Sequence, residues 1–173
     1  PVGHGAGVVA VGESGTLFPP LDYEQDMPAG LMTDYRAERD DFAVTGSPAL
    51  PDGLNMGTQL YWMERLYPRE MAAATLLPWA QYWAFWLSGV ARSEVSSLGC
   101  HTDLWAPAAG EYSPMARRLG WAEKFAPLAK ADEAIGTVSA DLAAATGLPV
   151  TAKIYTGLHD SNAALHAARG FAA

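Results

Sequence analysis

The segment from Met71 to Ala91 contains no charged residue and is rich in aromatic side chains. A helix that spans a membrane needs about 20 consecutive, predominantly apolar residues, with its aromatic residues near the two ends. In this segment Pro78, Gln81 and the aromatic cluster lie in the middle instead, which argues against a membrane span. The pattern predicts a helix that has Pro78 in its first turn and ends at Gly89.

Four aromatic residues follow the spacing i, i+3, i+4 and i+7 within this expected helix: Trp79, Tyr82, Trp83 and Trp86. Residues at this spacing share one side of a helix, so we expect them to form one broad buried face. Hydrophobic residues make up 50% of the 173-residue chain and charged residues only 17%. This balance supplies enough apolar surface for a packed core, and we expect one sizeable folded domain.

The charge balance limits the classes of partner. The chain has 11 Lys and Arg residues against 19 Asp and Glu residues, which gives a formal net charge of −8 and a pI near 4.8. A surface that follows nucleic-acid phosphates needs clustered basic side chains, whereas the basic residues here are few and scattered, so we expect no nucleic-acid partner. The single cysteine, Cys100, cannot form an internal disulfide and fits a reducing cytoplasm.

Turn and capping residues divide the chain into helices and strands. The first half predicts a β-hairpin of residues 6–11 and 16–18, a long irregular or weakly helical segment over 22–53, a helix over 55–66 and a helix from Pro68 to about Thr75. The second half predicts a helix capped by Ser113, a helix from Ser139 to Thr146, a strand over 150–156 and a turn into a helix over 157–168. Helices that alternate with strands indicate an α/β domain.

Polar residues follow the last expected strand, in the run from Gly157 to Ala164. Sheets in α/β proteins bind ligands at such strand ends. Asp160 is either the N-cap of the next helix or a catalytic carboxylate, and His159 is either a buried histidine bonded to the backbone or a site residue. Near the N-terminus, His4 has a glycine on each side, which lets a ligand approach the backbone closely.

A metal-dependent phosphohydrolase is a weaker alternative. Its metal site needs an upstream His, a His-Asp pair and a downstream carboxylate. His101 and the His159-Asp160 pair could supply the first ligands, but no Asp or Glu follows Asp160 in the sequence. The ligand set is incomplete, so we expect no metal site of this kind in the chain. The chain also lacks a complete dinucleotide-binding, nucleophile-elbow or Walker motif.

Taken in order, four stretches resemble the FGGY family of carbohydrate kinases, in particular its xylulokinase-like branch. They are Gly3-His4-Gly5-Ala6 with the hairpin after it, Thr45-Gly46 with the helix after it, Leu76-Leu77-Pro78 through Ser88-Gly89, and Gly157-x-x-Asp160 before a helix of small residues. The resemblance implies the actin-like, ribonuclease-H-like ATPase fold. Residues 1–173 would form an incomplete N-terminal, sugar-binding lobe, without the family's first strands and its C-terminal nucleotide lobe.

The resemblance also implies roles for individual residues. Asp160 matches the family's general base, which accepts the proton of the sugar hydroxyl as that hydroxyl attacks the γ-phosphate of ATP. The sugar would lie against His4, Gly5, Tyr23, Glu24, His159 and Ser161. The glycerol-kinase branch carries Gln-Arg-Glu where this chain has Gly3-His4-Gly5, so a ketose or related polyol is expected as the substrate.

The resemblance implies ATP and Mg²⁺ for the full-length enzyme, which we expect in the cytoplasm. A sugar, the enzyme's own C-terminal lobe and a second copy in a homodimer are the expected partners, and the chain without its nucleotide lobe is expected to be inactive. The alternative is a non-catalytic module that binds a carbohydrate or a protein, if the chain is complete as it stands.

Overall fold

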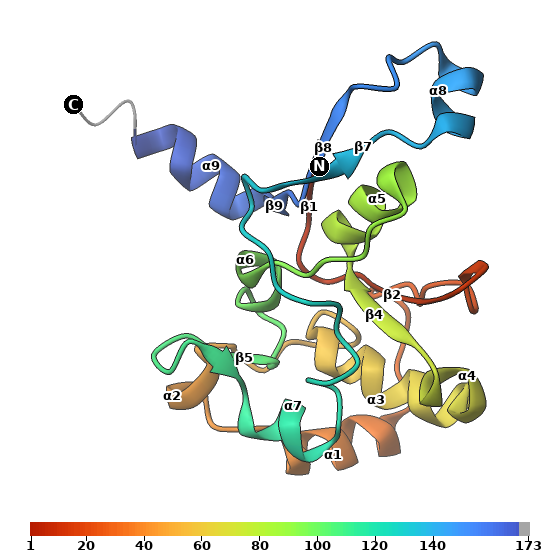
Figure 1. The fold of residues 1–173 in the computed structure, drawn as a ribbon. Coiled ribbons are helices and arrows are strands. Elements are labelled where there is room, and N and C mark those ends of the chain that lie inside the picture. The colour runs from red at the N-terminus through yellow and green to blue at the C-terminus, as the bar shows by residue number, and fades with distance from the viewer. Residues whose placement is uncertain (170–173) are drawn as a thin grey trace.

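The computed structural model describes residues 1–169, which form small sheets with helices around them (Figure 1). The central sheet has three antiparallel strands in the order β3-β2-β4. They are β2 (Val8–Gly12), β3 (Gly15–Thr16) and β4 (Thr75–Pro78). Val11 pairs with Thr16 and Gly12 with Gly15, which confirms the expected hairpin. Residues 8–11 are buried on both faces of β2, as their continuous apolar run indicates.

A second, parallel pair joins the first strand of the chain to a strand late in the sequence. Strand β1 (Val2–Gly3) pairs with β9 (Leu158–His159), so that Gly3 lies beside His159. Helix α9 (Asp160–Arg169) follows β9 directly and extends away from this pair (Figure 1). The expected helix is therefore confirmed, but a short strand lies where the tight turn was expected.

Helices pack below the central sheet in the view of Figure 1. They are α1 (Ala29–Glu38), α2 (Phe42–Thr45), α3 (Met56–Leu66), α4 (Pro68–Ala72) and α7 (Pro114–Arg118). The prediction of α3 is confirmed, whereas the segment 22–53 contains two helices and is less irregular than expected. The helix expected to reach Thr75 ends at Ala72, because residues 75–78 pair with β2 as strand β4. Pairing with a buried strand overrides the local preference there.

Helix α5 (Trp79–Ser88) begins one residue later than expected, with Pro78 as its N-cap, and ends at Gly89 with φ 75°. Its buried face is not the aromatic one that the spacing predicted. The small or polar residues Ala80, Gln81 and Ala84 are buried, while Trp83 and Trp86 are 39% and 49% exposed. Small side chains let the helix approach the strands closely. The aromatic rings pack against one another, and the half-buried Trp79 and Tyr82 also pack against the small core cluster around Val9 and Leu77. Within residues 1–169, no helix is long and apolar enough to cross a membrane.

The remaining elements lie after α5 in the chain. Helix α6 (Val95–Leu98) is followed by the paired strands β5 (Trp105–Ala106) and β6 (Glu111–Tyr112), and α8 (Ala140–Thr146) lies between the paired strands β7 (Ala134–Thr137) and β8 (Lys153–Tyr155). Ser113 and Ser139 accept hydrogen bonds from amides at the starts of α7 and α8, as expected for N-caps. The strand expected over 150–156 is shorter, over 153–155.

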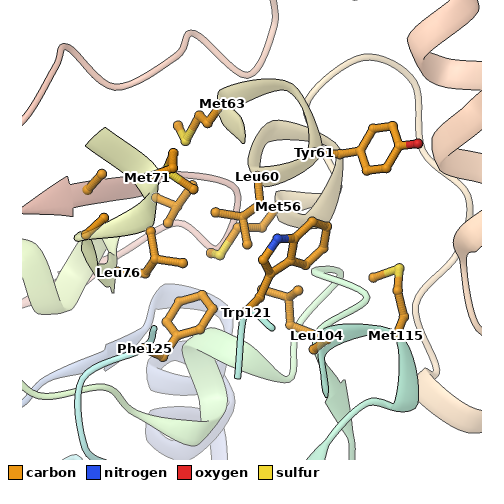
Figure 2. Packing of buried hydrophobic residues seen from close by; sticks show 14 of the residues in the cluster. Met56, Leu60, Tyr61, Met63, Met71, Leu76, Leu104, Met115, Trp121 and Phe125 are labelled. Carbon is orange, nitrogen blue, oxygen red and sulfur yellow. The ribbon is translucent and has the colours of Figure 1, made fainter. Parts of the chain in front are cut away.

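The main hydrophobic core lies between α3, β4 and the segment that carries Trp121 (Figure 2). Met56, Leu60 and Met63 recur along one side of α3 and are each 0% exposed. Trp121 is likewise fully buried, and Figure 2 shows its ring beside Leu60 and Met56. This core holds α3 against the sheet and therefore fixes the loop that leads into α3, which borders the site described next.

Candidate functional site

Every residue that the sequence assigned to the site lines one pocket of about 360 Å³. Its walls come from distant parts of the chain: the segment after β1, the loop before α1, the residues before α3, the loop after α6, and the β9–α9 junction. The lining residues are His4, Gly5, Ala6, Tyr23, Glu24, Leu54, His101, His159, Asp160 and Ser161. Of these, the sequence did not point to Ala6 or Leu54, and it considered His101 only as a metal ligand.

Asp160 is the first residue of α9, and its side chain is 51% exposed. Its Oδ1 accepts hydrogen bonds from the backbone N–H of Ser161, at 2.6 Å, and from the hydroxyl of Ser161, at 3.4 Å. An N-cap side chain accepts from an amide two or three residues further on. Within residues 1–169, no hydrogen bond joins the carboxylate of Asp160 to an amide two or three residues further on, and Asp160 lines the pocket.

His159 is buried, and its backbone N–H and both of its ring nitrogens have partners in the protein. Its backbone N–H donates to Ser96 Oγ at 3.1 Å, its Nδ1 lies 3.1 Å from Asn162 Oδ1, and its Nε2 lies 3.3 Å from Asp160 Oδ1. Ser96 in turn donates to the buried carboxylate of Glu94, which also accepts the backbone N–H groups of Ser96 and Ser97. Through this chain of hydrogen bonds the start of α6 orients the residue next to Asp160.

At this site two glycines let the backbone approach neighbouring residues more closely than a side chain would allow. A Cβ on Gly5 would lie 2.1 Å from Cys100 Sγ and 3.0 Å from His159 Nε2. Gly157 has φ 78°, and a Cβ there would lie 2.1 Å from the carbonyl oxygen of Pro1. The side-chain amide of Gln81 donates to the carbonyl groups of Thr156, at 3.3 Å, and Gly157, at 3.2 Å. The turn before Asp160 is thus fixed from both sides.

His4 forms the border between this pocket and a second one of about 250 Å³. The imidazole centroid lies 4.9 Å from that of Tyr23 and 6.0 Å from that of Trp79. Tyr23 also lines both pockets, and Trp79 lines the second. The rings of His4 and Tyr23 are tilted, and those of His4 and Trp79 are stacked. Packed rings of this kind hold one another in place and offer flat apolar faces to a ligand.

Burial shifts two pKa values beside the pocket. Burial lowers the pKa of His101 below its usual 6.5, and the charge of the nearby His159 lowers this pKa further. Burial raises the pKa of the Cys100 thiol to about 11, so this thiol stays protonated and unreactive at neutral pH. Among residues 1–169, no three His, Cys, Asp or Glu side chains are grouped as ligands for a metal ion.

No family model and no curated protein matches the sequence. Among solved structures, the chain is similar to a carbohydrate kinase from Novosphingobium aromaticivorans, with a TM-score of 0.96 and 60% identity over 98% of this chain and 37% of that chain. This similarity relates the chain to carbohydrate kinases, in line with its resemblance to the FGGY family. It spans little more than a third of the length of that kinase.

The kinase fold is also found at lower identity. A xylulose kinase from Rhodospirillum rubrum has a TM-score of 0.70 and 23% identity over 90% of this chain and 33% of that chain. A glycerol kinase from Plasmodium falciparum has a TM-score of 0.75 and 11% identity over 92% of this chain and 33% of that chain. The chain accordingly has the actin-like, ribonuclease-H-like fold, as part of the N-terminal lobe.

Proposed function

We propose that this chain supplies the sugar-binding site and the general base of an enzyme that transfers a phosphoryl group from ATP to a hydroxyl of a ketose or polyol. The observation that carries the proposal is the pocket in which Asp160 lies with His4, Glu24 and His159. These side chains come from segments far apart in the sequence, and together they offer hydrogen-bond partners for several hydroxyl groups. The similarity to a carbohydrate kinase at 60% identity supports the same class of substrate.

In this proposal Asp160 accepts the proton of the sugar hydroxyl that attacks the γ-phosphate. Phosphoryl transfer passes through a loose transition state, so the position of the base matters more than its strength. The contacts from Ser161 and His159 to Oδ1 of Asp160 hold one oxygen of the carboxylate. Its other oxygen, Oδ2, would then take the proton.

ATP and Mg²⁺ are assigned to the C-terminal lobe of the full-length enzyme. Among residues 1–169, no group of three or more His, Cys, Asp or Glu side chains is placed to hold a metal ion. When bound, Mg²⁺ neutralises charge on the transferred phosphoryl group. This chain's own residues bind the sugar and take up its proton. A cytoplasmic location and a homodimer are further proposals from the resemblance.

The experiment measures ADP release by the full-length protein over a panel of ketoses and polyols. We expect Asp160→Asn to lower kcat by about 10²–10⁴-fold, the usual contribution of a general base, while sugar binding is kept. Asp34→Asn is the matched control, because Asp34 is an exposed carboxylate on α1. Undiminished turnover in Asp160→Asn would overturn the assignment of the base. Sugar binding without ADP release by the wild type would indicate a non-catalytic module.

A further inference from the structure

His101 lies in the candidate sugar site although neither the spacing of the motifs nor the resemblance assigned it a sugar-binding role. It comes from the loop after α6, yet it lines the same pocket as Asp160, Glu24 and His4. Its ring centroid lies 6.4 Å from that of His159, with the two rings at 75°. The loop thus adds a third imidazole to the walls of this pocket.

The loop that carries His101 is held by buried polar side chains. Asn55, which is 1% exposed, donates from its side-chain amide to the carbonyl of His101 at 2.7 Å. Two residues further on, the carboxylate of Asp103 accepts hydrogen bonds from Tyr35, at 2.6 Å, and from Arg39, at 2.7 and 2.9 Å. Because the backbone at His101 and just after it is held by these bonds, the position from which its side chain enters the pocket is defined.

The ring nitrogens of His159 already have partners in the protein, whereas those of His101 can still form hydrogen bonds with a ligand. Both ring nitrogens of His159 lie near protein oxygen atoms, on Asn162 and Asp160. For His101, burial and the charge of neighbouring groups shift its pKa, and no hydrogen bond within residues 1–169 contributes to that shift. Since this environment favours the neutral ring, His101 offers one donor and one acceptor.

When the carboxylates of the pocket are ionised, they accept hydrogen bonds and cannot donate them. Asp160 and Glu24 can therefore accept hydrogen bonds from the O–H groups of a sugar. They cannot donate to the lone pairs of the sugar's hydroxyl oxygen atoms. A neutral imidazole can donate to such an oxygen or accept from the hydroxyl, as the geometry requires. His101 complements the two carboxylates in this respect.

We propose that His101 is a substrate-binding residue that hydrogen-bonds one hydroxyl of the sugar and so contributes to the choice of sugar. The inference rests on the proposed function, since it places the sugar in this pocket. It is a binding role and assigns no chemical step to the imidazole.

The test measures the dissociation constants of the preferred sugar and of its monodeoxy analogues by calorimetry, with the full-length protein. One hydrogen bond between uncharged groups accounts for about a 3- to 10-fold change in affinity. We expect wild type to bind the analogue that lacks the hydroxyl bonded by His101 more weakly than the sugar, by this factor. We expect His101→Ala to bind that analogue and the sugar with equal dissociation constants. His166→Ala is the matched control, because His166 is exposed in the last turn of α9.

The outcomes separate the two proposals. For each analogue, the test gives the ratio of its dissociation constant to that of the sugar. If this ratio is the same in His101→Ala as in wild type for every analogue, the role of His101 is overturned, whatever the turnover. Sugar binding without ADP release by wild type would overturn only the kinase reaction, and absence of sugar binding would overturn both proposals. If His101→Ala does not fold, His101→Leu keeps most of the side-chain volume without the ring nitrogens, and the same loss of discrimination is expected.

Discussion

At the scale of single residues, the turn before Asp160 depends on the absence of a side chain at Gly157. Its φ of 78° belongs to the left-handed region, and the carbonyl of Pro1 occupies the space that a Cβ would need. The same carbonyl accepts the backbone N–H of Leu158 at 3.2 Å. The conformation of Gly157 and the pairing of β1 with β9 are therefore coupled.

Gly157→Ala is expected to destabilise the protein by more than the strain of a left-handed residue alone. That strain costs about 1–2 kcal/mol. Gly89→Ala gives the matched comparison, because Gly89 has φ 75° and a Cβ there would point into open space as far as residues 1–169 are concerned. Chemical denaturation measures both variants. Equal losses in the free energy of unfolding would show that Pro1 does not limit the space at Gly157.

At the scale of elements, buried polar groups hold the loop of residues 99–104 against α1 and α3. Asp103 has φ 69°, an uncommon conformation for a residue with a side chain. Its carboxylate is 1% exposed and forms a salt bridge with Arg39, whose side chain is 14% exposed. The hydroxyl of Tyr35 donates to the same carboxylate, and its burial, followed by the charge of Asp103, raises the pKa of Tyr35.

Asp103→Ala is expected to lower the free energy of unfolding by about 3–5 kcal/mol, because it leaves the partly buried Arg39 and the buried Tyr35 hydroxyl without their acceptor. Glu111→Ala is the matched control. It removes the salt bridge of Glu111 with Arg117, whose two side chains are 56% and 51% exposed, and such exposed pairs contribute about 0–1 kcal/mol. Urea denaturation compares the two. Similar small losses in both variants would contradict a stabilising role for the buried group.

At the scale of the whole molecule, one core supports the walls of the site. Leu60 and Trp121 are fully buried in it, and α3 connects that core to Leu54, which lines the pocket, and to Asn55, which bonds the carbonyl of His101. Gln59 on the same helix donates from its buried side-chain amide to the carbonyl of Ala6. Packing of α3 is thus linked to the segment that carries His4 and Gly5.

Leu60→Ala is expected to lower the free energy of unfolding by about 2–5 kcal/mol, because it leaves a cavity in this core (Figure 2). Leu165→Ala on α9 is the control, since Leu165 is 56% exposed and surface changes usually stay within about 0.5 kcal/mol. Thermal and urea unfolding measure both. A loss in Leu60→Ala no larger than that of the control would place Leu60 outside the cooperative core.

Much of the local structure could be predicted from the sequence. The caps Ser113 and Ser139, the hairpin at Gly12 to Gly15 and the helix end at Gly89 follow from side chains acting on the backbone within a few residues. The resemblance to FGGY kinases, carried by short motifs in a fixed order, led to the kinase family. These features are local, so the order of residues is enough to indicate them.

Strand β4, the buried face of α5 and the place of His101 required the tertiary structure. Residues 75–78 form a strand because β2 offers them a partner, and α5 buries Ala80 and Ala84 because the strands beside it require close approach. His101 reaches the pocket because Asn55 and Asp103 hold its loop there. The sequence by itself determined the local turns, caps and family motifs. Contacts between residues far apart in the chain decided which side chains meet at the site, since such contacts depend on packing that no short pattern encodes.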